Sequence, residues 1–516
     1  MTPASDGARP EGKPVSLWTV TAGTTDYPAL REDMEVDVAV IGAGIAGLTA
    51  ALALKRAGRT VAVIEAARVG TGVTGHTTGK VTSLHRLAYT GLARSHGTDT
   101  ARTYGQANQA AIEHIAHVVA GEGIDCDFRR VANYTYTESD NALGLVRAEA
   151  NLAAQLGLPS TFTTDVPLPF AVKGAVRFDG QAQIHSVKYL QGLARAVNGE
   201  GSFVFEQTRA QRVHDGTPGA VVTEHGTVHA RDIVVATNVP FDARGLFYLR
   251  CHPHRSYIVA GRVDTPPLDA TFISADEPMR SILTLNVGGT SYVLAGGEGH
   301  RVSEAGDTRG RYGRLAAFAH DRLDATQVDY RWSTQDAMPL DGMPYVGLAS
   351  PFAKHVYVIT GLRKWGLTNG TVAALILADT INGQKNPWAR VFNSNRITPL
   401  ASASRFVREN TKTFTAILTG KLASRRPGHE ILAPGTGTVI KIGGQDTAVY
   451  KDEEGQVRTL SATCTHLGCT VGFNPSDTTW DCPCHGSRYA TDGTVIQGPA
   501  TKNLAPGPSR LPEGLA

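Results

Sequence analysis

The chain has 516 residues, of which 41 % are hydrophobic and 19 % are charged, and its formal net charge is +3. This composition is that of a globular protein long enough for about three domains or lobes. The small net charge argues against a nucleic-acid partner, and the polar stretch 1–14 lacks the apolar core of a signal peptide. We therefore expect a cytoplasmic protein without a transmembrane segment, which begins with a polar arm over residues 1–35.

The segment 37–65 reads as a strand, a glycine-rich turn, a helix and a second strand that ends in an acid. We expect strands at 38–41 and 60–64 and a helix at 48–56. This pattern is typical of dinucleotide binding, in which the glycines allow a tight turn, close approach to a pyrophosphate and close helix packing. The terminal acid binds the ribose diol. The expected contacts here are Gly42, Gly44, Ile45, Ala46, Gly47 and Glu65. A membrane span is the alternative, but the uncharged run 38–54 is shorter than the ~20 residues required.

The next segments alternate between loops, helices and strands. Residues 66–83 suit a loop along a cofactor, with Ala66, Gly75, His76, Thr77, Thr78, Gly79 and Lys80 as its expected contacts. Helices are expected at 99–119, 142–156 and 183–197, and strands at 129–137, 203–223 and 227–237. The run 233–237, which contains Ala236 and Thr237, is a buried parallel strand that returns to the first sheet. Glu113, His114 and His117 fit a solvated helix face better than a metal site.

The second half of the chain predicts a separate, partly antiparallel sheet between residues 256 and 294. A strand at 356–360, a glycine-rich turn at 361–370 and a helix at 371–381 then repeat the strand–turn–helix pattern. Residues 396–428 read as a linker with a charged amphipathic helix at 405–422. Residues 429–516, rich in short strands and Gly/Pro turns, predict a small β domain.

The six cysteines are unevenly distributed. Cys126 and Cys251 stand alone and are expected to be buried thiols. Four more lie in two short motifs, Cys464-Thr-His466-Leu-Gly-Cys469 and Cys482-Pro-Cys484-His485. Two thiolates and two imidazoles form the ligand set of a Rieske-type [2Fe–2S] cluster. Zinc is the alternative for a Cys/His set, although the order of the ligands and the two extra cysteines disfavour it.

Residues 36–370 resemble the flavoproteins related to D-amino-acid oxidase, which include glycine and sarcosine oxidases. The matching pieces are the Gly42–Gly47 turn with Glu65, the 70–79 loop, Ala236-Thr237, the segment 341–347 and the 361–370 turn. The resemblance implies FAD, bound in an extended form beneath a second, substrate-covering sheet. It adds Asp341, Gly361, Trp365, Gly366, Leu367 and Thr368 to the cofactor contacts. The chain departs from the pattern in showing no obvious arginine–tyrosine pair for an amino-acid carboxylate.

Residues 430–510 resemble the Rieske proteins of respiratory and photosynthetic cytochrome complexes. This resemblance implies that Cys464, His466, Cys482 and His485 hold the irons and that Cys469 and Cys484 form a disulfide. It also implies that the hydroxyl groups of Ser487 and Tyr489 bond the cluster sulfurs, and that residues 498–500 form a covering proline loop. Rieske oxygenases carry their cluster domain before the catalytic domain, whereas this chain has the reverse order.

The expected architecture is an α/β FAD-binding Rossmann-like domain with an interleaved mixed-sheet substrate domain over residues 36–395, followed by an all-β Rieske domain. The expected function is a dehydrogenase that oxidises a C–N bond of an amine or amino-acid-like substrate by hydride transfer to FAD. The cluster then passes single electrons to a ferredoxin, cytochrome or quinone. The alternative is an electron-transfer partner of a biosynthetic redox enzyme. The catalytic candidates are His76, Lys80, Tyr257, Lys364 and Trp365. His76 also matches the histidine that carries covalent flavin in dimethylglycine-dehydrogenase-like relatives.

Overall fold

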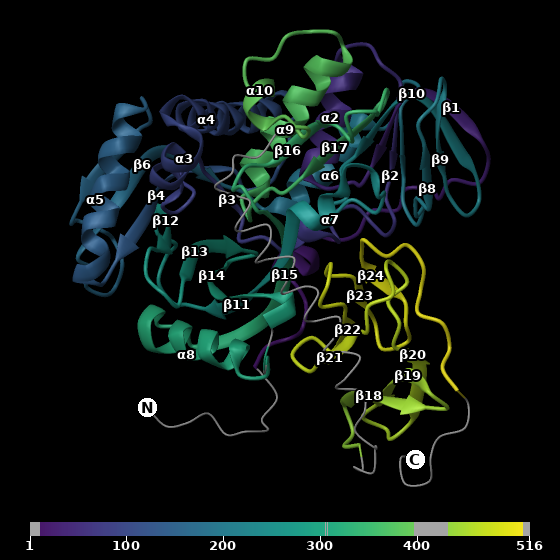
Figure 1. Cartoon of the computed structure of the whole chain (residues 1–516). Coiled ribbons are helices and arrows are strands. Elements are labelled where there is room, and N and C mark those ends of the chain that lie inside the picture. Colours follow the sequence, from purple (N-terminus) through teal and green to yellow (C-terminus); the bar gives the residue numbers. More distant parts are fainter. Residues whose placement is uncertain (1–10, 305, 307, 397–431, 509–516) are drawn as a thin grey trace.

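The computed structural model describes residues 11–304, 306, 308–396 and 432–508 (Figure 1). Nearly all of the expected linker, including its expected helix at 405–422, lies outside these residues. The described part of the N-terminal arm contains the short helix α1 (Leu17–Ala22), in which Trp18 is fully buried. Among the described helices, none combines the length and the apolar character that crossing a membrane requires.

The first sheet has eight strands and carries the glycine-rich turn at the end of its central strand β1 (Met34–Ile41). β1 pairs in parallel with β2 (Val61–Ile64) and with β10 (Thr227–Val235), which confirms the predicted parallel return of the chain. Such strands are buried on both faces, which explains their uninterrupted apolar sequences. The remaining strands are β7 (Phe203–Phe205), β8 (Arg212–His214), β9 (Gly219–Val222), β16 (Tyr345–Leu348) and β17 (Val356–Thr360).

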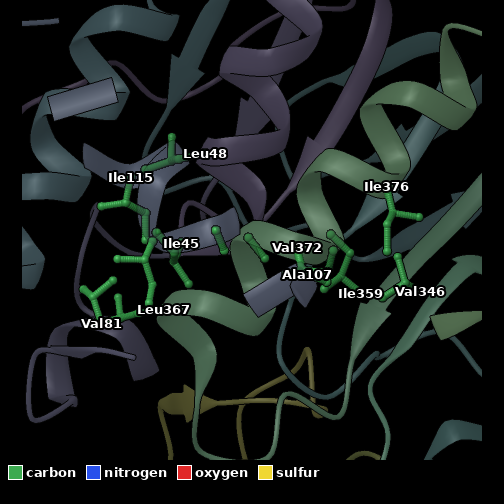
Figure 2. Packing of buried hydrophobic residues seen from close by; sticks show 14 of the residues in the cluster. Ile45, Leu48, Val81, Ala107, Ile115, Val346, Ile359, Leu367, Val372 and Ile376 are labelled. Atoms are coloured by element: carbon green, nitrogen blue, oxygen red, sulfur yellow. The ribbon is translucent and has the colours of Figure 1, made fainter. Parts of the chain in front are cut away.

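Helices α2 (Ile45–Arg56) and α9 (Gly366–Ile381) cross closely over this sheet, and their apolar side chains form the main core (Figure 2). Both helices begin earlier than predicted, α2 by three residues and α9 by five. A Cβ atom on Gly370 would lie 3.1 Å from Cγ2 of Ile45. A glycine inside a helix thus allows α9 and α2 to pack closely, just as the glycines of the turn allow the tight turn.

Further helices surround this core. α4 packs against α3 and α9, and α6 packs against α2. The bounds of these elements are α3 (Ala88–His96), α4 (Thr98–Gly121), α6 (Ser186–Val197), α7 (Phe247–Arg250), α10 (Ala389–Phe392), and the 3₁₀ turns η1 (Val73–His76), η2 (Arg244–Leu246) and η3 (Val302–Glu304).

The second sheet has nine strands and is mixed, because β12 pairs with β4 in parallel whereas its other pairs are antiparallel. The sequence pattern predicted it only at 256–294, but strands from the first half of the chain complete it. Its strands are β3 (Lys80–Val81), β4 (Arg129–Thr137), β5 (Ser160–Thr163), β6 (Gly174–Gln183), β11 (Cys251–Arg262), β12 (Ala270–Ser274), β13 (Arg280–Val287), β14 (Thr290–Arg301) and β15 (Gln327–Pro339). Helices α5 (Asp140–Gln155) and α8 (Arg311–Leu323) pack on it.

The C-terminal β domain consists of a three-stranded and a four-stranded sheet. It lies beside the second sheet and below the first in the view of Figure 1. Its small core contains Trp480, Tyr489 and the four clustered cysteines. The strands are β18 (Thr436–Ile442), β19 (Gln445–Lys451), β20 (Val457–Ser461), β21 (Gly472–Asn474), β22 (Thr479–Asp481), β23 (Arg488–Tyr489) and β24 (Val495–Gln497).

Candidate active site and metal centre

A large cavity of about 920 Å³ lies between the two major sheets. Its volume falls in the upper part of the ~300–1,000 Å³ range of small-molecule and cofactor sites. Its wall is built from three parts of the chain: the ends of β1, β2 and β10, the face of the second sheet, and a segment of the β domain. Residues from both major sheets and from the β domain therefore line the cavity.

The glycine-rich turn forms one end of this cavity. Gly42 has a φ of +105°, and a Cβ atom there would lie 2.7 Å from the carbonyl oxygen of Ala236. A Cβ atom on Gly47 would lie 1.9 Å from the carbonyl oxygen of Gly42. Gly44 lines the cavity just before the first turn of α2, so the positive end of the helix faces the space for a pyrophosphate.

Glu65 ends β2 and lines the same end of the cavity. Its carboxylate accepts hydrogen bonds from the backbone N–H groups of Ala43, at 2.8 Å, and Ala67, at 3.0 Å. Burial raises the pKa of Glu65, and these two hydrogen bonds oppose that shift. The acid is thus held in one orientation at the place where the motif puts the ribose, so the residues present fit an FAD.

The predicted cofactor contacts divide into two groups. Those that line the cavity are Gly42, Gly44, Ile45, Ala46, Glu65, Ala66, His76, Thr77, Thr78, Ala236, Thr237, Trp365, Gly366 and Leu367. The cavity lining does not include Gly47, Gly75, Gly79, Asp341, Gly361 or Thr368. Asp341 instead forms a two-point ion pair with Arg396, at 2.8 and 2.9 Å, and Thr368 donates to the carbonyl of Thr82 at 3.0 Å. These two residues support the cavity wall from behind.

Two lysines line the cavity, and both donate hydrogen bonds to residues of the second sheet. Lys80 on β3 is 5 % exposed and donates hydrogen bonds to the Oγ of Ser281, at 2.6 Å, and to the carbonyl of Phe272. Lys364 precedes α9 and donates to the Oγ of Ser256 at 2.6 Å. Burial lowers the pKa of Lys80 to about 7 and that of Lys364 to about 8. Both amines therefore titrate near neutral pH.

The three other catalytic candidates have different surroundings. His76 ends η1, and its Nδ1 lies 2.8 Å from the carbonyl oxygen of Gly72. The ring of Trp365 stacks on His85 with centroids 4.7 Å apart. Tyr257 also contributes to the wall, but its hydroxyl lies 3.1 Å from Nε2 of His300. Its ring packs against α8, on the side of the sheet that faces the β domain.

Polar residues that the sequence analysis missed lie on β11 and β15. His254, Ser256 and Asp336 all line the cavity, and Asp336 is only 8 % exposed. Burial raises the pKa of Asp336 to about 6, against the opposing influence of the Lys364 charge. The alternation of β15 indicates that Asp336 shares a face with Thr334 and Met338, but it does not indicate that this face lines the cavity.

The two predicted metal-binding loops come together in the β domain. The thiol groups of Cys464 and Cys482 lie close enough to influence each other's ionisation, and the rings of His466 and His485 have centroids 5.1 Å apart. The Nδ1 atoms of both histidines are buried without a hydrogen-bond partner in the described chain. Two adjacent thiols and two free imidazole nitrogens fit a cluster held by two cysteines and two histidines.

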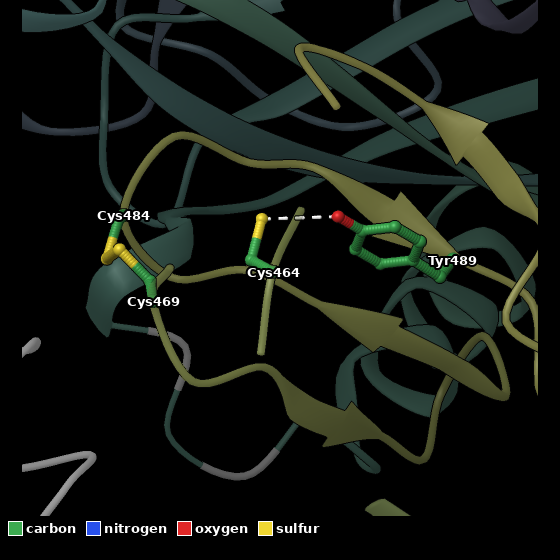
Figure 3. Close-up of a disulfide and its surroundings, with 4 residues drawn as sticks. All are labelled: Cys464, Cys469, Cys484 and Tyr489. Atoms are coloured by element: carbon green, nitrogen blue, oxygen red, sulfur yellow. Dashed lines mark hydrogen bonds between the residues drawn. A yellow bond between two sulfur atoms is a disulfide. The ribbon is translucent and has the colours of Figure 1, made fainter. Parts of the chain in front are cut away.

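Cys469 and Cys484 form a disulfide that joins the two loops, with Cα atoms 6.6 Å apart (Figure 3). The disulfide occupies these two sulfurs, which lie within 4.8 Å of the sulfur of Cys482. Figure 3 also shows the hydroxyl of Tyr489 directed at Cys464, with 3.2 Å between oxygen and Sγ. Ser487 accepts a hydrogen bond from the backbone N–H of Ala500 at 3.0 Å. The disulfide that the resemblance implies is thus present.

The residues set aside in the sequence analysis take no part in these sites. Cys126 is buried and Cys251 is partly buried, and burial raises the pKa of each thiol to about 12. Glu113 on α4 pairs with Arg130 at the surface, with 2.7 Å between Nη2 and Oε2. Among the described residues, no three His, Cys, Asp or Glu side chains on α4 come together as metal ligands do.

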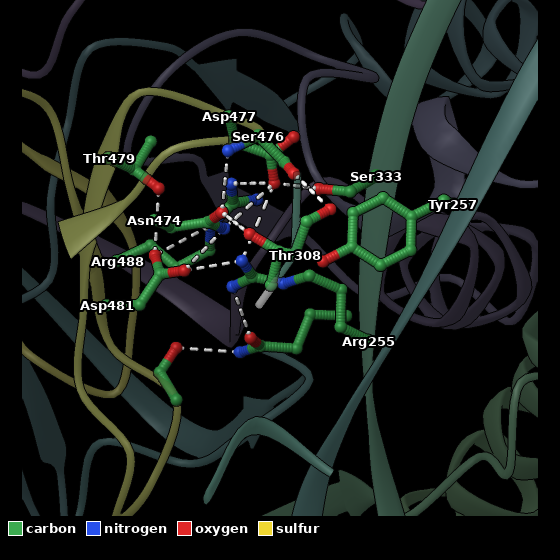
Figure 4. Close-up of polar contacts among 12 residues, drawn as sticks. Arg255, Tyr257, Thr308, Ser333, Asn474, Ser476, Asp477, Thr479, Asp481 and Arg488 are labelled. Atoms are coloured by element: carbon green, nitrogen blue, oxygen red, sulfur yellow. Dashed lines mark hydrogen bonds and ion pairs between the residues drawn. The ribbon is translucent and has the colours of Figure 1, made fainter. Parts of the chain in front are cut away.

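A buried ionic network attaches the β domain to the second sheet (Figure 4). Arg255 on β11 bonds to Asp481, and Arg488 bonds to Asp477 at 2.9 Å and to Asp481 at 3.4 Å. The side chain of Arg255 is 2 % exposed and those of the other three are 10–11 % exposed. Burial opposes the charge of Asp481, yet Arg255 and Arg488 lower its pKa to about 2. Asp481 is therefore charged at neutral pH.

Neutral hydrogen bonds extend this interface. Ser333 on β15 and Tyr312 on α8 donate to Asp477, at 2.6 and 2.8 Å. Gln335 donates from Nε2 to the carbonyl of Gly486 at 2.7 Å, next to the ligand His485. Tyr248 on α7 lies edge to face with His485, with centroids 5.2 Å apart. The flavoprotein part thus contacts the ligand loop itself.

The β domain also contributes to the cavity. Its wall includes Arg488 and the segment 496–501, which contains the predicted proline loop. Because Ser487, which follows the ligand loop 482–486, accepts a hydrogen bond from Ala500, the loop that touches the cavity is linked to the second metal-binding loop.

Comparisons with known proteins agree with both halves of this arrangement. A family model described as FAD dependent oxidoreductase matches residues 37–380, and one described as Rieske [2Fe-2S] domain matches residues 428–508. Over 493 residues the chain is 34 % identical to the putative Rieske 2Fe-2S iron-sulfur protein YhfW of Bacillus subtilis, a match that covers 95 % of this chain and 97 % of that protein.

Two further comparisons concern the separate domains. The cytochrome b6-f complex iron-sulfur subunit of Synechococcus elongatus is 44 % identical over 86 residues, which are 16 % of this chain and 44 % of that protein. The crystal structure of glycine oxidase from Geobacillus kaustophilus matches with a TM-score of 0.60 and 20 % identity, over 70 % of this chain and 99 % of that one, and shows the fold. The chain therefore belongs to the family of FAD-dependent oxidoreductases and carries a Rieske [2Fe–2S] domain.

Proposed function

We propose that the chain is a dehydrogenase that oxidises an amine-containing substrate in the cavity and passes the electrons one at a time through its own Rieske cluster to an external acceptor. One observation carries this proposal. Arg488 and the segment 496–501 of the Rieske domain line the same cavity as Gly44, Glu65 and Lys364 of the flavoprotein part. The domain that carries single electrons thus lines part of the cavity in which the two-electron oxidation takes place.

When bound, FAD accepts a hydride from the substrate and the Rieske cluster carries a single electron, so together they convert two-electron oxidation into one-electron transfer. The chain supplies the arrangement. The turn of Gly42 and the carboxylate of Glu65 hold the nucleotide, and the substrate sheet closes the cavity opposite it. Ser256 holds the amine of Lys364 in the wall of the cavity. Tight positioning of this kind is a large part of what an enzyme contributes.

The domain interface supports transfer within one chain. The buried pair of Arg255 with Asp481, the hydrogen bonds from Ser333 and Tyr312 to Asp477, and the hydrogen bond from Gln335 to Gly486 hold the Rieske domain in one orientation. Separating it would leave the buried charge of Arg255 without its partner, which is costly for a buried ion. We infer that the cluster receives electrons while the domain stays docked.

We infer that the electrons leave the cluster near the exposed part of the first metal-binding loop. Leu467, which follows the ligand His466, is 53 % exposed, and His466 itself is half-buried. This part of the loop offers an external one-electron acceptor, such as a ferredoxin, cytochrome or quinone, an approach to the histidine edge of the cluster.

An anaerobic titration tests this function. Candidate amines are added to the full-length protein loaded with FAD and cluster, and flavin absorbance and the paramagnetic resonance signal of a reduced Rieske cluster are followed. We expect an amine to bleach the flavin and produce the cluster signal, and NADPH to do neither. Reduction by NADPH or a protein donor alone would contradict the proposal and favour an electron-transfer partner of another enzyme.

A further inference from the structure

The cavity face of the second sheet carries its own set of polar side chains. Arg255 and Gln335 point to the Rieske domain, as their bonds to Asp481 and Gly486 show. His254 and Asp336, the neighbours of these two residues on β11 and β15, are direct cross-strand partners. Because successive side chains of a strand point to opposite faces, His254 and Asp336 lie on the face away from the Rieske domain. Both line the cavity.

Asp336 is the acid of this face that lacks a partner. Asp336 is 8 % exposed, and its carboxylate forms no hydrogen bond or ion pair within the described chain. A buried carboxylate without a hydrogen-bonding or charged partner is strongly unfavourable. A ligand that supplies this partner removes the cost, which is a reason for such a group to be present in a binding site. Burial raises its pKa to about 6, which leaves it negatively charged at neutral pH.

The neighbouring bases do not neutralise this acid. The amine of Lys364 donates to the Oγ of Ser256 at 2.6 Å, and its charge acts on Asp336 without forming an ion pair in the described structure. His254 carries no charge at neutral pH, because burial and the nearby charge of Lys364 lower its pKa to about 2. The missing side chain of Gly299 leaves room for both bases, since a Cβ atom there would lie 2.8 Å from His254 and 3.3 Å from Lys364.

We propose that Asp336 recognises a cationic amine nitrogen of the substrate, which makes it a specificity-determining residue of this cavity. An ammonium group brings a positive charge and several N–H donors, which is what an unpartnered carboxylate accepts best. An anionic ligand is repelled by the same carboxylate. This proposal names the substrate class of the site assigned above and rests on the proposed function.

The test uses two ligands of the same shape and opposite charge. tert-Butylamine has no hydrogen on the carbon that bears its nitrogen, so it binds without being oxidised, and pivalate is its anionic counterpart. Each is titrated into the oxidised, FAD-loaded full-length protein, and the dissociation constant is read from the change in the flavin absorbance spectrum. The variants are Asp336→Asn, Asp336→Glu and the control Glu277→Gln. Glu277 is 73 % exposed at the cavity rim, where it pairs with Arg86 at 2.9 Å.

We expect Asp336→Asn to raise the dissociation constant of tert-butylamine by about 100-fold, which corresponds to about 2.8 kcal/mol, and to leave pivalate binding equal or tighter. Asp336→Glu restores most of the amine affinity, and Glu277→Gln changes it by less than about threefold, as is typical of an exposed ion pair. The proposal is overturned if Asp336→Asn weakens the amine no more than Glu277→Gln does, or if it weakens both ligands alike.

Lys364→Met keeps the proposal testable if Asp336→Asn loses its flavin. Removal of this nearby positive charge is expected to leave tert-butylamine binding unchanged or tighter, so clearly weaker binding would overturn the proposal. The dehydrogenase function and the role of Asp336 can each be contradicted without contradicting the other. Amine binding that depends on Asp336, without any amine-driven flavin reduction, contradicts the dehydrogenase function alone. Amine-driven flavin reduction that is indifferent to Asp336 contradicts the specificity assignment alone.

Discussion

Arg255 and Asp481 form a buried ion pair between the strand that walls the cavity and the strand that follows the first metal-binding loop of the Rieske domain. Asp481 immediately precedes the ligand Cys482, and Gln335, which accepts a hydrogen bond from Arg255 at 2.8 Å, donates in turn to Gly486. A single arginine side chain thus links the substrate sheet to both flanks of the second metal-binding loop. The position of the cluster relative to the cavity depends on it.

Arg255→Ala is expected to loosen the docked Rieske domain while leaving FAD binding intact. Removing one partner of a buried ion pair costs up to about 3–5 kcal/mol, and here the buried carboxylate of Asp481 loses one of its two arginine partners. Flavin reduction by substrate should continue, whereas reduction of the cluster should become slower, as measured by rapid mixing with freeze-quench paramagnetic resonance. Arg262→Ala is the matched control, because Arg262 lies on the same strand and pairs with Asp329 at the surface. Equal cluster reduction in both variants would contradict a role for Arg255 in docking.

Tyr489→Phe removes the hydroxyl that lies 3.2 Å from Sγ of Cys464 and 3.2 Å from the backbone nitrogen of Thr465. Hydrogen bonds to the sulfurs of a cluster stabilise its reduced, more negative form. We therefore expect a lower reduction potential, measured by redox titration, with flavin content unchanged. Tyr450→Phe, in the same domain core, serves as the control. An unchanged potential in Tyr489→Phe would show that this hydroxyl does not tune the cluster.

Loss of the disulfide, by Cys469→Ala with Cys484→Ala, is expected to release the two metal-binding loops from each other. A disulfide that closes a loop of this length contributes roughly 3 kcal/mol, a large part of what a small domain can supply. The cluster should be lost sooner and the Rieske domain should unfold earlier, as followed by visible absorbance during heating. Flavin content should stay the same, and Cys126→Ala controls for removal of a cysteine elsewhere. A cluster lifetime equal to that of the parent protein would contradict this structural role.

Asp336 should lower stability at neutral pH. Its folded-state pKa of about 6 lies above the ordinary value of 3.8, so the unfolded chain loses its proton first and stability falls as pH rises between about 4 and 6. Asp336→Asn removes this dependence and should stabilise the protein at pH 7 by up to about 3 kcal/mol. Lys364 and His254 are the basic groups that face this carboxylate. Thermal unfolding at pH 4, 6 and 8 measures the difference. A variant that is less stable at pH 7 would identify Asp336 as a structural counterion of Lys364.

The sequence predicted the parts of the fold in which a local pattern has one physical meaning. The Gly42–Gly47 turn, the strands at 129–137 and 356–360 and the two metal-binding loops depend on neighbouring residues; the structure has both strands at these bounds and brings the two loops together. The pattern predicts the start of α9 five residues too late, because Gly366 and Gly370, which are typical of turns, lie inside the helix. There they allow contact with α2.

Contacts between residues that are far apart in the sequence could not be predicted from local patterns. Asp336 comes to the cavity because β15 pairs with β11, and Arg255 reaches Asp481 because the Rieske domain docks on that sheet. Both relationships join residues distant in sequence, and no local pattern specifies them. The strand alternation of β15 predicts which residues share a face, but the identity of the partner on each face requires the folded structure.

Electron transfer from the flavin to the cluster within one docked chain is the step on which the proposed function depends. The direct test is rapid anaerobic mixing of the holoprotein with a reducing amine, in which flavin absorbance and the paramagnetic resonance signal of the cluster are followed at protein concentrations that differ by about tenfold. We expect the cluster to be reduced after the flavin, with a rate constant that is independent of protein concentration and smaller in Arg255→Ala. A rate proportional to protein concentration, or a cluster that stays oxidised beside a reduced flavin, would contradict it.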